Sequence, residues 1–143
     1  QANRVRISLF PVFLFSLFLA ACDSQSIDKG STSTSCQNNS HCNYPNNVEV
    51  WLNNPDISPE TPFTINLKLP KEAKNLSAKL EGVTMYMGFI PLQFKQTGQV
   101  WVADTMVGAC SEPVMTWKMM LTYTSGDNQP QTLLYYFDSL QTR

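Results

Sequence analysis

Sulfur-bearing side chains have the most distinctive chemistry in this sequence. Met85 and Met87 stand two residues apart, so they would share one face of a strand. Met115 and Met119 recur four residues apart, and Cys110 lies shortly before them. Thioethers and thiolates are soft ligands that suit Cu(I). We therefore identify Met85, Met87, Cys110 and Met115 as candidate metal ligands, and Cu(I) as the candidate cofactor.

The same methionines have a second interpretation. Methionines at alternate positions of a strand commonly fill irregular gaps in a hydrophobic core. Trp101 and Trp117 would be their large neighbours in such a core. The exposure of Met85 and Met87 separates the two interpretations, because core methionines are inaccessible to metal.

The chain has four cysteines, and Cys36, Cys42 and Cys110 are the disulfide candidates. Three thiols in an oxidising compartment predict one disulfide and one free cysteine, unless a partner chain pairs with the third. Cys36 and Cys42 would close a small loop. Pairing one of them with Cys110 would close a long loop and stabilise more, by roughly 4 kcal/mol in the chain-entropy model. The spacing leaves both pairings open.

Catalytic patterns are weak in this sequence. Its single histidine, His41, lies in a polar segment, whereas nucleophilic catalysis needs a base held rigidly beside the nucleophile. We find no glycine-rich phosphate loop, no Cys-x-x-Cys pair and no His-x-x-His pair. We also find no run of basic residues of the kind that nucleic-acid binding requires. The sequence therefore predicts neither an enzyme nor a nucleic-acid-binding protein.

The first 21 residues have the pattern of a signal peptide. Arg4 and Arg6 are followed by the apolar run 7–20, which is too short to favour a bilayer-spanning helix. Small residues, Ala20 and Ala21, then precede Cys22. Loss of residues 1–21 removes two of the ten basic residues and none of the eleven acidic ones, which leaves a net charge of −3.

The string Leu19-Ala20-Ala21-Cys22 resembles the lipobox of bacterial lipoproteins. The resemblance implies that the Cys22 thiol receives a diacylglyceryl group, that cleavage makes Cys22 the first residue, and that its amine is often acylated. It also implies a lipid anchor in the bacterial cell envelope, facing the periplasm, with the bilayer as a partner. We separately expect a protein partner in the envelope. Asp23 resembles the inner-membrane retention signal of enteric lipoproteins, which favours the inner membrane.

The elements that position these residues follow from composition and period. Residues 22–47 are polar, which predicts a flexible tether behind the lipidated N-terminus. From Val48 to residue 143, short apolar runs end at Pro, Gly and Asn, and their alternation predicts strands. A helix over 71–81 competes with the strand there, but the alternation continues into Met87. The expected strands are 48–52, 63–69, 76–87, 92–96, 100–107, 114–124 and 132–137, with hairpin turns at 97–98 and 125–128. This pattern predicts an all-β fold, an Ig-like antiparallel β-sandwich of about seven strands.

A further resemblance spans residues 48–137. The order Gly82-Val83-Thr84-Met85-Tyr86-Met87-Gly88, Trp101, Gly108-Ala109-Cys110 and Met115-Thr116-Trp117 resembles FixH/YtkA-like periplasmic sandwich domains. That resemblance implies an accessory role in assembly or copper loading of respiratory oxidases. We therefore expect a non-catalytic binding or accessory module, with a Cu(I)-binding accessory protein as the alternative.

The lipid anchor is tested by replacing the acceptor thiol. Metabolic labelling with a fatty-acid analogue should mark the wild-type protein and leave Cys22→Ser unlabelled, because only the thiol can receive the diacylglyceryl group. Equal labelling of both proteins would contradict the lipoprotein interpretation.

Overall fold

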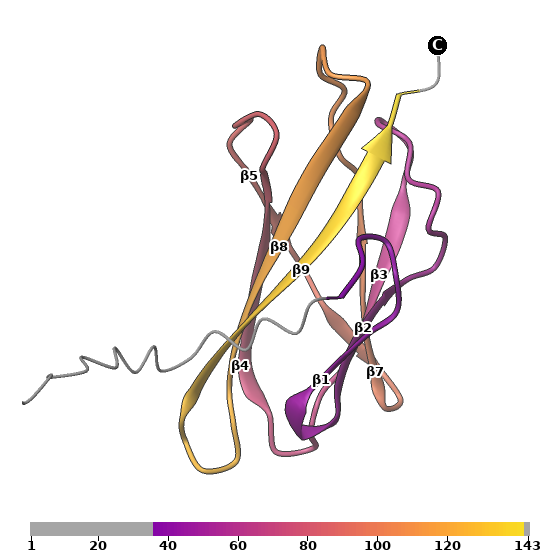
Figure 1. The fold of residues 1–143 in the computed structure, drawn as a ribbon. Helices are drawn as coiled ribbons and strands as arrows, with labels where there is room; N and C mark the ends of the chain where they lie inside the picture. The colour runs from indigo at the N-terminus through magenta and orange to yellow at the C-terminus, as the bar shows by residue number, and fades with distance from the viewer. Residues whose placement is uncertain (1–35, 142–143) are drawn as a thin grey trace, which may run out of the picture.

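The structure, a computed structural model, describes residues 36–141, which form two antiparallel β-sheets packed face to face (Figure 1). One sheet has the strand order β1-β2-β3-β7-β6, and the other has the order β5-β4-β8-β9. A short 3-10 turn, η1 (Pro45–Asn47), joins β1 to β2. The strands are β1 (Cys42–Tyr44), β2 (Val48–Leu52), β3 (Phe63–Lys68), β4 (Lys74–Gly82), β5 (Phe89–Leu92), β6 (Lys95–Thr97), β7 (Val100–Thr105), β8 (Val114–Thr124) and β9 (Pro130–Leu140).

The predicted all-β sandwich is confirmed, although the described part has nine strands instead of about seven. The expected strand 92–96 is two elements, because the chain leaves the second sheet at Leu92 and enters the first at Lys95. Alternation along a sequence does not reveal such a change of sheet. Residues 74–82 are a strand, as preferred over the helix. Among residues 36–141 no helix has the length and apolar composition needed to span a membrane.

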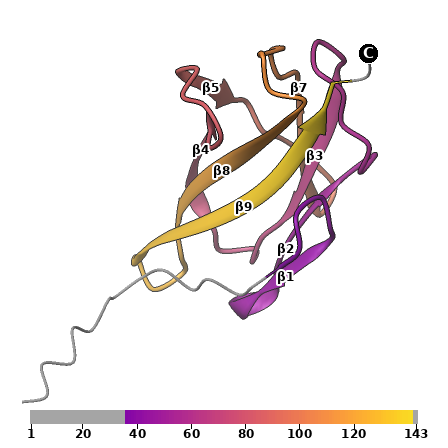
Figure 2. The ribbon, with the colours of Figure 1, turned by 45° about the horizontal axis from the view of Figure 1, so that its top comes forward.

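Figure 2 shows the two sheets facing each other. The core lies between them and is built from alternate residues of their strands. Ile65 and Leu67 enter it from β3, while Tyr135 and Phe137 enter it from β9. Phe63 meets Phe137 edge to face, with ring centroids 5.4 Å apart. Such aromatic pairs add to the free energy that burial of the rings already supplies.

The predicted tether is wrong at its C-terminal end. Strand β1 pairs with β2, and the Cys42 and Tyr44 side chains are buried. The sandwich domain therefore begins before the predicted boundary at Val48. The polar composition of the predicted tether was misleading at this end, because β1 buries only alternate residues. The predicted signal peptide (1–21), Cys22, Asp23 and the first part of the tether lie outside the described residues.

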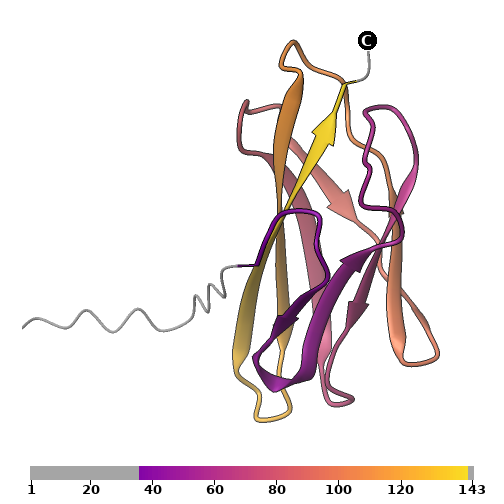
Figure 3. The ribbon, with the colours of Figure 1, turned by 45° about the vertical axis from the view of Figure 1, so that its right-hand side comes forward.

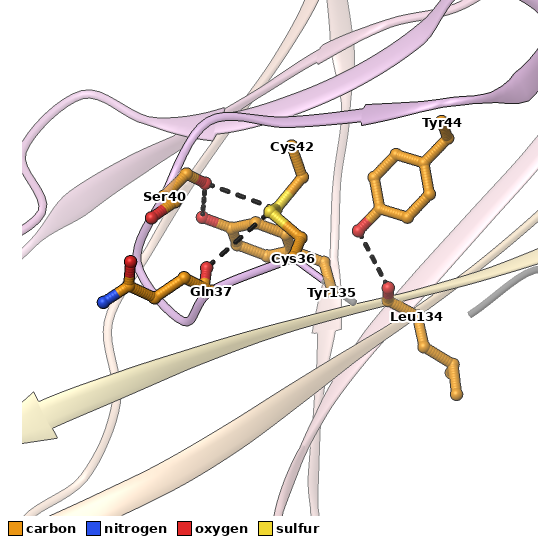
Figure 4. The surroundings of a disulfide bond; sticks show 7 residues. All are labelled: Cys36, Gln37, Ser40, Cys42, Tyr44, Leu134 and Tyr135. Atoms are coloured by element: carbon orange, nitrogen blue, oxygen red, sulfur yellow. Dashed lines mark hydrogen bonds between the residues drawn. A yellow bond between two sulfur atoms is a disulfide. The ribbon is translucent and has the colours of Figure 1, made fainter. Parts of the chain in front are cut away.

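Cys36 and Cys42 form a disulfide, so the short-loop pairing is the correct one and Cys110 is the free thiol among the described residues (Figure 4). Their Cα atoms are 5.8 Å apart, within the usual range for a disulfide. The disulfide closes the loop that carries Asn38 and Asn39 toward β9.

Asn39 completes the outer edge of β9. Its side-chain amide donates to the Asp138 carbonyl oxygen at 2.9 Å, and the Asp138 N–H donates to Asn39 Oδ1 at 2.6 Å. The Asn39 N–H also donates to the Tyr136 carbonyl oxygen at 3.3 Å. Asn39 has a positive φ of 62°, a conformation that asparagine tolerates better than most residues. The Asn39 side chain therefore makes the hydrogen bonds with β9 that the backbone of a neighbouring strand would otherwise make.

Two tyrosine hydroxyls also join the disulfide loop and β1 to β9 by hydrogen bonds (Figure 4). Tyr135 Oη donates to the Ser40 carbonyl oxygen and Tyr44 Oη donates to the Leu134 carbonyl oxygen, each at 2.9 Å. Burial raises the pKa of Tyr44 from 10.0 to about 12 and also raises the pKa of Tyr135. Both hydroxyls therefore keep their protons, and remain donors, throughout the physiological pH range.

Loss of the disulfide should loosen this attachment. The Cys36→Ser/Cys42→Ser variant should lose about 2 kcal/mol of unfolding free energy, the chain-entropy value for so short a loop. Urea denaturation followed by circular dichroism measures the loss. Cys110→Ser, which keeps the disulfide, is the matched control. A double variant as stable as the wild type would show that the loop contributes nothing to the fold.

Candidate functional site

One end of the sandwich collects the sulfur-bearing residues singled out from the sequence. It is formed by the β4–β5 loop (83–88), the β7–β8 loop (106–113), the start of β8 and the end of β9. Figures 1 and 3 show these segments at the end opposite the β8–β9 hairpin. We call this region the sulfur end.

The β4–β5 loop was expected to be strand, and that expectation is wrong. Strand β4 ends at Gly82, where the Val83 N–H donates to the Thr116 carbonyl oxygen at 2.8 Å. The Thr116 N–H then donates to the Thr84 hydroxyl at 2.9 Å. This hydroxyl takes the place of the backbone carbonyl that would accept the hydrogen bond if the strand continued. A Cβ on Gly82 would collide with the Met85 carbonyl oxygen and with Met115 Cε. Glycine therefore lets the loop fold back over its own strand.

This loop carries Met85 and Met87 at the surface, with 38% and 41% of their area exposed. The core-packing interpretation is therefore wrong for these two residues. Met119 is buried within the sandwich, so the core-packing interpretation is correct for it. Met115 is also buried, but its sulfur contacts the half-buried thiol of Cys110. Trp117 lies between Met115 and Met119, and its indole N–H donates to Ser139 Oγ at 3.1 Å.

Cys110 and Met115 are in direct contact. The Cys110 sulfur lies 3.7 Å from the Met115 sulfur, and the thiol is half-buried. Met87 packs on the same loop, since its Cε lies 3.6 Å from the position that a Cβ on Gly108 would occupy. The structure thus joins two of the four candidate ligands, and it places Met87 against the loop that carries Cys110. The carbonyl oxygen of Met85 lies close to Gly82, the last residue of β4.

Histidine and carboxylate ligands do not gather within residues 36–141. This part of the chain contains no group of three or more His, Cys, Asp and Glu side chains arranged to hold a metal. A metal ion bound at the sulfur end would therefore have to be held largely by thioethers.

Exposed apolar side chains surround the sulfurs, and the sequence reasoning missed them. Tyr86 is 76% exposed and Phe89 is 60% exposed. The other exposed apolar residues of this end are Val83, Met106, Val114 and Leu140. A signal was present in Met85-Tyr86-Met87, because a strand with one buried face cannot bury three consecutive apolar residues. We call these six residues, with Met85 and Met87, the apolar patch.

His41 lies on the outer face of the first sheet and not in a tether. Its Nε2 is 2.9 Å from Glu49 Oε2, and its ring stacks on Trp51 with centroids 4.9 Å apart. Hydrogen bonds from His41 and Lys68 hold the pKa of the Glu49 carboxyl below its usual range. The histidine thus belongs to a surface ion-pair group away from the sulfur end.

No family model matches the sequence, and no curated protein matches it. Among solved structures, the fold is similar to that of a DUF4426 family protein from Pseudomonas aeruginosa PAO1, with a TM-score of 0.49 and 13% sequence identity. The match covers 73% of this chain and 96% of that one.

Proposed function

We propose that this chain is a non-catalytic binding module of the bacterial cell envelope, anchored through lipid on Cys22 and docking a protein partner with its apolar patch. The observation that carries the proposal is the patch itself. Several large apolar side chains are exposed at one end of the domain, whereas a core of buried apolar residues lies between the sheets. Large apolar side chains left exposed at one end of a domain are a typical mark of an interaction site.

The composition of the patch favours a protein as the occupant. Tyrosine, phenylalanine and methionine are the residue types enriched at the centres of protein interfaces. Two lysines beside the patch, Lys79 and Lys118, share the Glu81 carboxylate, at 3.1 and 3.4 Å. Lys79 also lies 5.3 Å from the centre of the Phe89 ring.

The scaffold holds the patch in place. Val83 and Thr84 are tied to Thr116 by backbone and hydroxyl hydrogen bonds, and Val114 pairs with Leu140 at the adjoining ends of β8 and β9. A backbone held by such contacts loses less conformational freedom on binding, which favours affinity.

Site-specific photo-crosslinking in the producing cells tests the partner. A photoreactive residue at Tyr86 should give one protein adduct that the same residue at Tyr136, an exposed tyrosine on β9, does not give. Adding Phe89→Ser should abolish the adduct, because it removes a large apolar contact at the patch. Identical adducts at both positions, or only an adduct between two copies of this chain, would contradict the proposal.

We propose Cu(I) binding as the second candidate function, in line with a role in oxidase maturation. The observation that favours it is the 3.7 Å contact between the sulfurs of Cys110 and Met115. A thiolate and a thioether in contact are two soft ligands. Met85 and Met87 stand partly exposed on the neighbouring loop, where they are open to incoming metal.

A competition titration of Cu(I) against a chromophoric chelator tests this candidate. Cys110→Ser and Met85→Leu/Met87→Leu should each weaken binding strongly, whereas Met120→Leu, on the outer face of β8, should leave it unchanged. Leucine keeps the side-chain volume, so the fold should lose less than about 1.5 kcal/mol. Equal affinity in all variants, or no binding by the wild type, would contradict a Cu(I) site.

A further inference from the structure

A groove opens at the end of the sandwich opposite the sulfur end. It lies between η1, the β3–β4 connection and the β6–β7 hairpin, which Figures 1 and 3 show gathered at that end. Its lining residues include Asn46, Asn47, Gln96 and Gln99 together with Trp101. Neither the proposed partner surface nor the proposed copper site uses this groove.

Trp101 supplies an apolar surface within the groove. It lies on β7 opposite Leu67 and Gln96, it is half-buried, and it packs against the core. The same side chain also lines a second cavity, with Leu76 and Phe94. One partly accessible indole therefore adjoins both hollows at this side of the sandwich.

The four carboxamides are free to bind a ligand. All four residues are exposed, and their side chains form no hydrogen bond with another residue of the part that the structure describes. Each carboxamide offers two donors and one acceptor oxygen. The backbone that presents them is turned tightly, with positive φ at Asn46, Asn47 and Gly98.

The charge of the groove is close to balanced. Lys68 is already engaged by Glu49, with its Nζ 3.2 Å from the carboxylate. Lys71 is followed by Glu72, and both line the groove. A polyanion would find little net attraction here, whereas an uncharged, hydroxyl-rich molecule would find many donors and acceptors beside an aromatic face.

We propose that this groove binds a neutral oligosaccharide. The apolar face of a sugar ring would stack on Trp101, and its hydroxyl and amide groups would exchange hydrogen bonds with Gln96, Gln99, Asn46 and Asn47. The groove is more polar than most small-molecule sites, which suits a hydroxyl-rich ligand, and Trp101 supplies the aromatic surface. The proposal goes beyond the partner-binding and copper proposals, since it depends on neither Cys22 nor the apolar patch.

Binding is tested with two defined probes, chitotetraose and cellotetraose, by isothermal titration calorimetry and by NMR of the glutamine side-chain amides. At least one probe should bind and shift the Gln96 and Gln99 amide signals. Gln96→Ala/Gln99→Ala should weaken binding by about tenfold or more, the effect of losing one or two net hydrogen bonds. Gln129→Ala, an exposed carboxamide outside the groove, should bind as the wild type does.

Trp101 gives the second arm of the test. Binding should quench or shift tryptophan fluorescence, and Trp51→Phe should keep that change because Trp51 lies on the outer face of the sheet beside His41. Trp101→Phe should weaken binding while circular dichroism shows the fold retained. No binding of either probe to the wild type, or an unchanged affinity in the glutamine double variant, would overturn the proposal.

Discussion

The hydrogen bonds between Asn39 and β9 are the interaction on which the rest of the fold depends. A strand of eleven residues at the border of a sheet exposes a row of backbone groups that invite pairing with another chain. Here Asn39 binds the backbone of Tyr136 and Asp138, Tyr44 binds Leu134, and the Leu140 N–H donates to the Ile57 carbonyl oxygen at 2.9 Å. The edge is thereby covered by the chain's own N-terminal segment and by the residues before β3.

Asp138 ties this closure to the centre of the second sheet. Its carboxylate accepts a hydrogen bond from Asn38 at 3.0 Å and another from Thr116 Oγ1 at 2.6 Å. Thr116 in turn accepts from Val83 and donates to Thr84, so a chain of polar contacts runs from the disulfide loop to the β4–β5 loop. The other sheet edges are short: β1 and β6 have three residues each, and β5 has four and includes Pro91. Short strands and proline limit unwanted edge pairing.

The sequence predicted the sandwich and most of its strands because burial on one face imposes a period of two, as in Phe63–Lys68. It did not predict the role of Asn39, whose partners lie about a hundred residues away and are joined by side-chain geometry alone. The same limit explains the error at Met85 and Met87. Alternation continues past Gly82, but the chain folds back there, with the Met85 carbonyl oxygen and the Met115 methyl in the space that a Cβ at position 82 would need. The sequence indicated that Cys110 and Met115 lie near each other, on a loop and on the strand after it. It did not predict that their sulfur atoms are in contact.

Amide hydrogen exchange measured by NMR on the full chain tests the closure most directly. If Asn39 completes the edge of β9, the Asp138 amide should be protected in the wild type and should exchange faster in Asn39→Ala. The Leu140 amide, which donates to Ile57 instead, should keep its protection in that variant. Rapid exchange of the Asp138 amide in the wild type, or equal protection in both proteins, would contradict the account.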